Sequence, residues 1–550
     1  MRLQSALHRA ELLHKLQQEP YDLVVIGGGI TGAGIALDAA SRGLKTALVE
    51  QNDFASGTSS SSTKLIHGGL RYLKQFEVAL VRETGRERAV VHKLAPHLVK
   101  PEKMLLPLIK GGSYGKIIAS LGLMIYDVLA GVEKADQRKM LTPPDTLKVE
   151  PLIRPDLIEG GGLYAEYRTD DARLTIEVIK TATQYGAHCC NYVKALEFTY
   201  NQANRITGLQ CQDQHTGQTF TINSKYVVSA AGPWVDELRK INQSLEGKQL
   251  HLTKGVHLVV PHKRFPVGQA IYFDVPDGRM IFAIPRGKIT YIGTTDTDYS
   301  GDINDVRTNM ADVQYLLDGV NHSFPKVALQ RDDIVSSWAG LRPLINEMGK
   351  SASEISRKDE IFESETGLIS IAGGKLTGYR KMAERIVNLV SKKIKAEHNQ
   401  QLKPCHTEQI VLTGGPFEDT EAVHAYTQQV AESLKYEGIT DPHHASYLVS
   451  NYGKQTEQIT DRLARVQAST PAVKLALAEL DYCMEHELTS HLADFLVRRS
   501  GRIFFWIDSI PEILAPLANT MATRLGWSEA EKARQLAAVQ TEINRATVFE

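Results

Sequence analysis

A glycine-rich turn constrains the fold of this 550-residue chain more than any other feature. It follows YDLVVI at Tyr21–Ile26, a β-branched run typical of a buried strand. It precedes Ile30–Arg42, where small and apolar residues alternate at helical spacing. A second apolar strand is predicted at Lys45–Val49. Strand, turn, helix and strand in this order open a parallel sheet with a crossover helix. The glycines of the turn are Gly27, Gly29 and Gly32, in the pattern G-x-G-x-x-G.

This glycine spacing is typical of a dinucleotide-binding turn. The first glycine permits a tight turn, the second lets the backbone approach a pyrophosphate, and the third lets the helix pack close to the strand. Ile30 and Thr31 begin the helix, whose N-terminus offers free N–H groups to phosphates. Glu50 ends the second strand, where a carboxylate accepts hydrogen bonds from both ribose hydroxyls and repels a 2′-phosphate. The fragment therefore allows NAD or FAD and disfavours NADP.

Two later segments favour FAD. Val227–Trp234 (VVSAAGPW) and Ile369–Thr377 (ISIAGGKLT) each read as a buried strand that ends in small residues and glycine. A nicotinamide enzyme usually keeps its nucleotide contacts in one contiguous domain, whereas these segments lie far along the chain from the first turn. A long, extended cofactor requires such separated contacts. The alternative interpretation is that both segments are ordinary strands followed by turns, with no role in binding. The candidate contacts are Ala231, Gly232, Trp234, Gly374, Lys375, Leu376 and Thr377.

Composition and charge exclude several classes of protein. Hydrophobic residues make up 42% and charged residues 23% of the chain, which excludes a disordered or coiled-coil protein. The formal net charge of −1 provides no basic field, so no nucleic-acid partner is expected. Five cysteines without a C-x-x-C motif favour neither a disulfide framework nor a zinc site, and no metal is expected. Met1–Pro20 is polar rather than an apolar export signal, which favours a cytoplasmic protein.

The rest of the chain divides by its hydrophobic pattern. A helix is predicted over Gly69–Lys93, followed by an irregular, proline-containing stretch from Leu94 to Pro155. Within that stretch Ile117–Val132 is too short to cross a bilayer and predicts a buried or interfacial helix. Helical spacing dominates about 415–550, after a polar linker, and predicts a helical C-terminal domain. Three further runs predict a separate antiparallel layer. They are His251–Val260, Met280–Pro285 and Thr290–Gly293.

Five sequence blocks together resemble the FAD-dependent glycerol-3-phosphate dehydrogenases. They are DLVVIGGGITGAGIALD at 22–38, GTSSSSTKLIHGGLRYL at 57–73, GTTD at 293–296, AGLRPL at 339–344 and GGKLTGYRKMAE at 373–384. The resemblance covers almost the whole chain, and the second and fifth blocks are specific to this family and its close oxidase relatives. It implies an α/β fold, with a glutathione-reductase-type FAD-binding domain, an antiparallel-sheet substrate cap and an all-α C-terminal domain.

The resemblance also implies domain bounds and a reaction. The FAD-binding domain would combine 20–75, 150–250 and 340–396, the substrate-binding cap 76–149 and 251–339, and the helical domain 409–550. Members of the family oxidise sn-glycerol 3-phosphate to dihydroxyacetone phosphate by hydride transfer from C2 to flavin N5, and they pass the electrons to a quinone. FAD is therefore the implied cofactor and sn-glycerol 3-phosphate the implied substrate. The location of that substrate and the lack of an export signal favour the cytoplasm or the inner face of the cytoplasmic membrane.

By similarity, the serine-rich loop and the block that follows it would contact the flavin cofactor. Hydroxyl and N–H groups of such a loop suit phosphate oxygens. The candidate contacts are Thr58, Ser59, Ser60, Lys64, Leu65, His67 and Gly68.

The substrate phosphate needs fixed positive charge, which the planar fork of arginine supplies best. By similarity, Arg71, Arg342 and Lys375 are the preferred phosphate ligands, with Tyr72 beside Arg71 and with Arg357 as a weaker candidate. Lys375 would also place positive charge near the flavin N1–C2=O locus, which stabilises an anionic reduced flavin.

The catalytic base has two histidine candidates, His67 in KLIHGG and His257 in KGVHLVV. Histidine titrates near neutral pH and so accepts the alcohol proton as hydride leaves. His67 would alternatively hold the flavin, and His257 would alternatively be a satisfied histidine inside a strand. The choice between them stays open, as does an arginine-assisted water; Arg342 and Lys375 complete the set of expected catalytic residues.

Quinone reduction would bring the protein to a membrane surface. Lys100, Lys103, Lys110 and Lys116 interleave with leucines in a segment that reads as loop-rich and suits anionic lipid. A part-buried loop with solvated lysines is the alternative. Two competing functions are an oxidase that reduces O2 to H2O2, whose mid-chain insertion this chain looks too short to hold, and a non-catalytic FAD-binding protein. The oligomeric state stays open, with a homodimer as one candidate.

Overall fold

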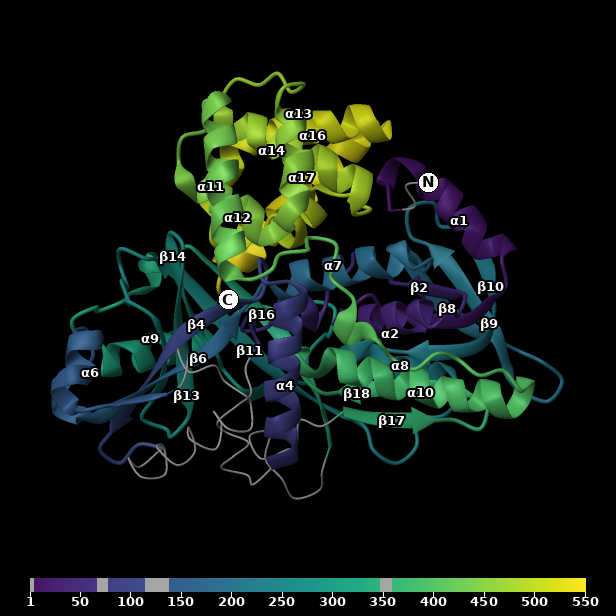
Figure 1. Ribbon diagram of the computed structural model, residues 1–550, viewed down its shortest axis with the longest axis horizontal. Helices are drawn as coiled ribbons and strands as arrows, with labels where there is room; N and C mark the ends of the chain where they lie inside the picture. The colour runs from purple at the N-terminus through teal and green to yellow at the C-terminus, as the bar shows by residue number, and fades with distance from the viewer. Residues whose placement is uncertain (1–3, 67–77, 114–137, 347–358) are drawn as a thin grey trace.

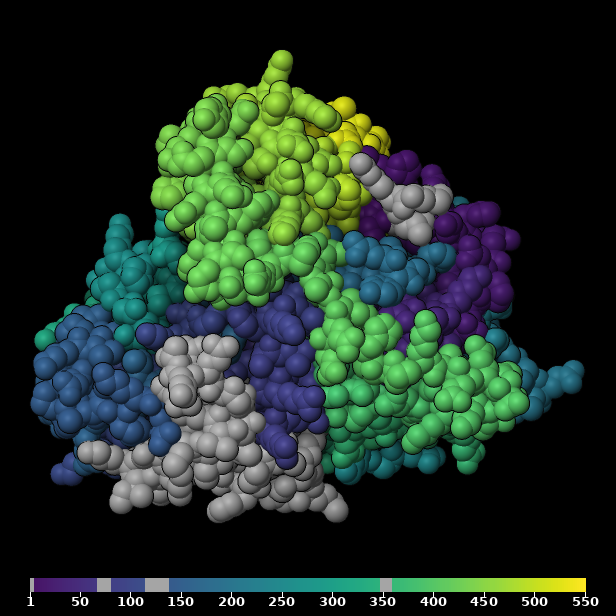
Figure 2. Space-filling model, in the orientation of Figure 1, coloured from purple at the N-terminus to yellow at the C-terminus, as the bar shows by residue number. Residues whose placement is uncertain are grey.

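The computed structural model describes residues 4–66, 78–113, 138–346 and 359–550 (Figure 1). Within these residues the chain forms two β-sheets with helices packed on them and a separate lobe of helices, which stands above the sheets in Figure 1. Figure 2 shows this lobe as the light green-to-yellow part at the top of the surface, packed on the rest of the molecule.

The first sheet carries the glycine-rich turn. Its strands run in the order β17, β18, β10, β1, β2, β7, and a hairpin of β8 and β9 extends from β10. β1 pairs in parallel with β2 and with β10, and β10 pairs in parallel with β18, so the carboxyl ends of these strands share one edge. The bounds are β1 Tyr21–Ile26, β2 Thr46–Val49, β7 His188–Cys190, β8 Val193–Tyr200, β9 Ile206–Asp213, β10 Thr219–Ser229, β17 Asp359–Glu363 and β18 Leu368–Gly373.

Helix α2 (Ile30–Ser41) lies between two neighbours on this sheet, α7 (Asp171–Gln184) and α10 (Tyr379–His398). Gly34 allows the close approach of α2 and α10, because a Cβ there would lie 2.9 Å from the Tyr379 ring. Their apolar faces and the strands form one buried core. Helix α1 (Arg9–Gln18) contacts β7 and β10, and α8 (Val235–Ile241) contacts β18.

The second sheet is the predicted antiparallel layer, and it is larger than expected. Its strands run in the order β15, β11, β14, β13, β12, β4, β6, β3, with β16 beside β11 and β5 beside β6. All its pairs are antiparallel except β12 with β4. The bounds are β3 Leu65–Ile66, β4 Lys100–Ile109, β5 Lys139–Leu141, β6 Ile158–Arg168, β11 Leu250–Pro261, β12 Ala270–Asp274, β13 Met280–Arg286, β14 Ile289–Gly293, β15 Thr297–Asp298 and β16 Ser336–Ile345. Helices α6 (Pro143–Val149) and α9 (Met310–Ser323) contribute to its core.

Two sequence predictions are corrected by this sheet, and the predicted domain bounds can be compared with it. The stretch from Leu94 to Pro155 is not irregular throughout, because Lys100–Ile109 forms β4. The leucines of β4 are buried, so they are not offered to a lipid surface as the membrane hypothesis required. The domain bounds at 150 and 340 do not coincide with the sheets, since β6 and β16 belong to the second sheet. Whether these parts are separate domains stays a prediction.

Other predicted elements fall as expected or outside the described residues. Helix α4 spans Val78–Leu94 and so ends one residue beyond the predicted helix, while residues 69–77 of that prediction lie outside the described ranges. Ile117–Val132 lies outside them as well. Across the part of the chain that the structure describes, no helix is both long and apolar enough to pass through a bilayer.

The C-terminal lobe is all-helical, as predicted. Its own core is continuous, and it is tied to the first sheet by buried charges: Arg173 of α7 donates two hydrogen bonds, of 2.7 and 2.9 Å, to Glu487. A π-helical turn at Asp494–Arg499 faces the same junction. The helices are α11 Thr420–Tyr436, α12 Pro442–Tyr452, α13 Thr456–Leu463, α14 Pro471–His486, α15 Arg502–Phe505, α16 Ile510–Leu525 and α17 Glu529–Thr547.

Candidate active site

One cavity of about 890 Å³ takes its walls from both sheets. The carboxyl ends of β1, β10 and β18 form one side, and β11 and β16 form the other. Seventeen residues predicted from the sequence lie on its wall. They are Gly27, Gly29, Ile30, Thr31, Glu50, Thr58, Ser59, Leu65, Ala231, Gly232, Trp234, His257, Arg342, Gly374, Lys375, Leu376 and Thr377. The three segments that are distant in sequence therefore meet at one concave site.

The glycine-rich turn is built for close backbone approach. Gly27 has a φ of +114°, and a Cβ on Gly32 would lie 1.9 Å from the Gly27 carbonyl oxygen. Glu50 accepts the N–H of Gly28 at 2.7 Å and the N–H of Asn52 at 2.9 Å, one on each carboxylate oxygen. Each oxygen keeps a second lone pair for a ribose hydroxyl. Burial raises the pKa of this carboxyl.

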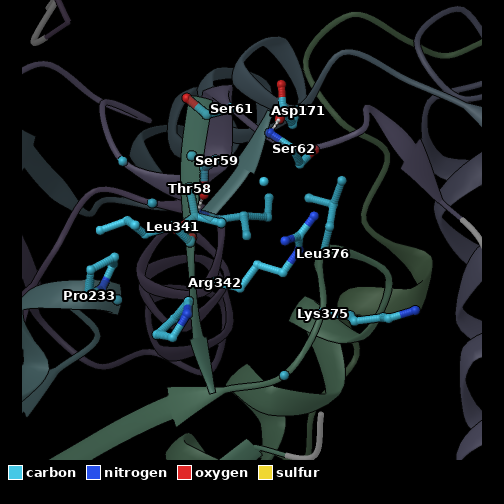
Figure 3. A pocket seen from close by; sticks show the side chains of 18 of the residues that line it. Thr58, Ser59, Ser61, Ser62, Asp171, Pro233, Leu341, Arg342, Lys375 and Leu376 are labelled. Carbon is cyan, nitrogen blue, oxygen red and sulfur yellow. Dashed lines mark hydrogen bonds between the residues drawn. The ribbon is translucent and has the colours of Figure 1, made fainter. Parts of the chain in front are cut away.

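The serine-rich loop bridges the two sheets. Ser59 Oγ accepts the N–H of Ile30 at 3.0 Å, at the start of α2. Thr58 Oγ1 donates to the Leu341 carbonyl of β16 at 2.7 Å. Gly340 of β16 permits this docking, since a Cβ there would lie 2.6 Å from Ser61 Cβ. Hydroxyl groups therefore line the cavity between the nucleotide turn and the second sheet, as Figure 3 shows.

His257 of β11 lies on the cavity wall and is 1% exposed. Its ring stacks on Trp338, with centroids 4.8 Å apart and planes at 12°, and occupies the space left by Gly293. Nε2 lies 3.0 Å from Thr63 Oγ1, while Nδ1 has no hydrogen-bond partner among the described residues. Burial lowers the pKa of His257 well below its ordinary value, and the charges of Arg342 and Lys64 lower it further. The imidazole is therefore neutral at neutral pH.

Arg342 of β16 lies at the same cavity, and its guanidinium is fixed by neighbouring groups. It donates to Thr294 Oγ1 at 2.9 Å and to the Thr295 carbonyl at 3.2 Å, and it forms an ion pair with Asp296 at 3.3 Å. In Figure 3 the guanidinium points towards Leu376, while the ammonium group of Lys375 points away from Arg342. The two cations thus line one cavity without converging on one point.

Comparison with known proteins agrees with this geometry. Residues 22–380 match the family model described as FAD dependent oxidoreductase, and residues 405–532 match the C-terminal domain of alpha-glycerophosphate oxidase. The aerobic glycerol-3-phosphate dehydrogenase of Staphylococcus saprophyticus is 47% identical over 98% of both chains. That of Staphylococcus aureus strain USA300 is 48% identical over 98% of this chain and 97% of its own. The chain belongs to the FAD-dependent family of aerobic glycerol-3-phosphate dehydrogenases.

Two solved structures have folds similar to that of this chain. The glycerol-3-phosphate dehydrogenase of Bacillus halodurans, complexed with FAD, superposes with a TM-score of 0.85 at 42% identity, covering 100% of both chains. An L-alpha-glycerophosphate oxidase from Mycoplasma pneumoniae shares the fold at a TM-score of 0.54 and 18% identity, over 70% of this chain and 97% of its own. The predicted fold class, the FAD cofactor and the assignment as an FAD-dependent oxidoreductase are confirmed.

Several predicted site residues of this family member lie elsewhere. Gly32, Ser60 and Lys64 are not on the cavity wall. Lys64 is buried, and its ammonium donates to Asp171 at 2.5 Å and to the Ser60 carbonyl at 3.0 Å, because a buried cation needs such partners. The others fall outside the described residues. They are His67, Gly68, Arg71, Tyr72 and Arg357.

Sequence reasoning missed the residues that hold the candidate groups in place. Thr294 and Asp296 orient Arg342, and Thr63 and Trp338 orient His257. The GTTD block at 293–296 could have indicated Thr294 and Asp296, because it is one of the blocks that carry the family resemblance, but no role was predicted for its residues. Trp338 carried no comparable signal, because only strand pairing brings it opposite His257.

Proposed function

We propose that this protein oxidises sn-glycerol 3-phosphate to dihydroxyacetone phosphate. The observation that carries the proposal is His257, a buried neutral imidazole on the cavity wall beside the cation Arg342. FAD supplies a two-electron acceptor when bound, so the protein must hold the substrate and remove the hydroxyl proton. Relatives that are 47% and 48% identical over nearly their full length carry the name of this activity.

His257 accepts the proton through Nδ1. With Nε2–H donating to Thr63 Oγ1, the lone pair of Nδ1 has no partner among the described residues. Nδ1 itself is buried, so the ring must shift at the cavity wall to present it to the substrate hydroxyl. His257 takes the hydroxyl proton as the C2=O bond forms, and a bound flavin would accept the two electrons of the C2–H bond as hydride. Burial and the nearby cations favour the neutral imidazole that this step requires.

Different residues of the cavity wall suit the substrate and the cofactor. Arg342, fixed by Thr294 and Asp296, suits an oxygen of the phosphate dianion, and Lys375 adds a second cation on the same wall. The nucleotide turn, Glu50 and the serine-rich loop suit the adenine half and the pyrophosphate of FAD. The cofactor would therefore run from the end of β1 to the end of β18.

Anaerobic addition of sn-glycerol 3-phosphate to the purified yellow protein tests the proposal directly. The visible flavin absorbance should bleach, and His257→Asn should slow the bleaching by a factor of roughly 100 to 1,000 with flavin content unchanged. His262→Asn is the matched control, because His262 lies just after the same strand and bonds Thr290 outside the cavity. Wild-type protein that stays yellow would refute the proposed activity.

We propose a quinone as the electron acceptor and peripheral contact with the inner face of the membrane. The dehydrogenase names of the relatives support a quinone, whereas the match of residues 405–532 to an alpha-glycerophosphate oxidase domain favours oxygen. Peroxide measured during aerobic turnover separates them, since stoichiometric H2O2 would identify an oxidase. Flotation with anionic liposomes at low salt tests the membrane contact, and absence from the lipid fraction would contradict it.

A further inference from the structure

The C-terminal helical lobe reaches the second sheet through Phe504 and Phe505 of α15. Ser336 Oγ of β16 donates to the Phe504 carbonyl at 2.6 Å, which fixes this helix against the strand. The Phe504 ring lies 5.4 Å from Trp338, and the Phe505 ring lies 5.8 Å from it, at an interplanar angle of 75°. We call Phe504 and Phe505 the aromatic pair. They belong to the C-terminal lobe and pack on the second sheet.

Trp338 connects this aromatic pair to the cavity. Its indole contacts both phenyl rings and also stacks on the His257 imidazole at 4.8 Å. The indole Nε1–H donates to the Ser62 carbonyl at 3.1 Å, which adds a fixed hydrogen bond to the ring contacts. Trp338 is 4% exposed, so a shift of any ring it touches changes the space in which it and His257 sit.

The same aromatic pair encloses a buried cation. The Lys64 ammonium lies 5.9 Å from the Phe504 ring centroid, 5.7 Å from that of Phe505 and 5.5 Å from that of Trp338. Its ion pair with Asp171 holds it there. Lys64 and Arg342 are the charged groups that act on His257, and Tyr291 is the remaining titratable ring beside it, at 6.4 Å. Phenyl rings exclude water from this ion pair, so the Asp171 carboxylate rather than solvent balances most of the charge of Lys64.

We propose that Phe504 and Phe505 are positioning residues for His257, acting through Trp338 and Lys64. The proposal rests on the proposed role of His257 as the base. The aromatic pair holds the indole against the imidazole and keeps water from Lys64, so the ring keeps its orientation and its neutral form. The C-terminal lobe thereby acts on the redox site without lining the cavity.

The holoenzyme of the double variant Phe504→Leu, Phe505→Leu tests this, because leucine keeps apolar bulk and removes both rings. Flavin content should stay at the wild-type level, while the rate of flavin reduction at saturating substrate falls roughly tenfold or more with little change in KM. Each tyrosine variant, Phe504→Tyr or Phe505→Tyr, keeps a ring and should retain most of the rate. Trp506→Leu is the matched control, since Trp506 follows the pair but contacts His443, His444 and Arg502.

A measurement without substrate separates this proposal from the proposed activity. Histidine ring NMR, with His257 assigned from the His257→Asn spectrum, should show the His257 ring signals displaced in the double variant, because the indole stacked on that ring loses its two aromatic neighbours, and unchanged in Trp506→Leu. Unchanged His257 signals with a wild-type reduction rate would overturn the proposal. Should the double variant not fold, the two single leucine variants decide, and wild-type behaviour of both would overturn it equally.

Discussion

Individual glycines reserve the space that the candidate catalytic side chains occupy. Gly293, the cross-strand neighbour of His257, leaves room for the imidazole: a Cβ there would lie 2.2 Å from its Cδ2. Gly255 leaves room for the Arg342 guanidinium, which a Cβ would approach to 2.3 Å. Neither glycine belongs to the nucleotide turn, so the second sheet is shaped by its own small residues.

Gly255→Ala should displace Arg342 without unfolding the chain. The obstructed atoms are the far end of a flexible side chain, so the guanidinium leaves Thr294 and Asp296 while the strand stays in place. The expected result is a KM for sn-glycerol 3-phosphate raised roughly tenfold, for the partial loss of a charge-assisted contact. Gly268→Ala is the control, since its Cβ would meet no atom nearer than 3.9 Å. Equal KM values for the two variants would contradict this placement of Arg342.

For individual residues, the sequence predicted those whose role depends on neighbours along the chain. It missed those whose role depends on contacts that form only in the folded protein. Gly27, Gly32 and Glu50 could be predicted because turn, helix and strand follow one another along the chain. The neutral form of His257 could not, since it depends on burial by Trp338 and on the charge of Lys64, which neighbours along the chain do not reveal.

Among the elements, β4 shows why part of the fold escaped prediction. Pro101 and Pro107 within Lys100–Ile109 argue against a strand, because proline cannot donate to a ladder. On one side, β4 pairs with β6 along nearly its whole length. On the other side, β4 pairs with β12 only at Met104 and Leu105. Both prolines therefore lie where one side of β4 has no strand partner, the edge setting in which sheets tolerate proline. A sequence shows the prolines and not which side of a strand is open.

The buried carboxylate of Asp53 holds the π-helical turn Asp494–Arg499 from outside the turn. Asp53, which follows β2, accepts from Arg498 Nε at 2.5 Å and from both terminal nitrogens of Arg499, at 2.6 and 2.8 Å. Asp53→Asn should cost about 3 kcal/mol, because Arg499, which is buried, and Arg498, which is largely buried, lose the carboxylate they share and keep only Glu487 and Asp494. Urea unfolding monitored by flavin release and far-UV circular dichroism measures the loss. Asp508→Asn, at an exposed position of the same lobe, should unfold like the wild type.

For the molecule as a whole, buried neutral histidines make stability depend on pH. Burial lowers the pKa of His97 to about 3 and that of His215 to about 4, below the ordinary value of 6.5. The unfolded chain then binds more protons below pH 6.5, so folding free energy is lost as the pH falls through that value. Each residue should remove about 1.4 kcal/mol between pH 7.5 and 5.5. His491, whose pKa is raised by Asp494, contributes in the opposite direction.

Urea midpoints of wild type and His97→Asn at pH 7.5 and 5.5 check this expectation. The variant should lose less stability on acidification than the wild type, although it starts less stable. His14→Asn, at an exposed position of α1, should follow the wild-type slope. The carboxylates with the most lowered pKa values, Glu487 and Asp494, titrate far below this window and do not obscure it. Parallel slopes for all three proteins would rule out His97 as a source of acid lability.

The parallel pairing of β1 with β10, and of β10 with β18, has a consequence for biosynthesis. Translation proceeds at about 5–20 residues per second, so β1 waits on the order of tens of seconds before Leu368–Gly373 leaves the ribosome. During that time the nascent chain exposes apolar strand edges, which is the condition that recruits chaperones. The flavin pocket is complete only when that late strand docks, so full coenzyme binding must wait until most of the chain has been made.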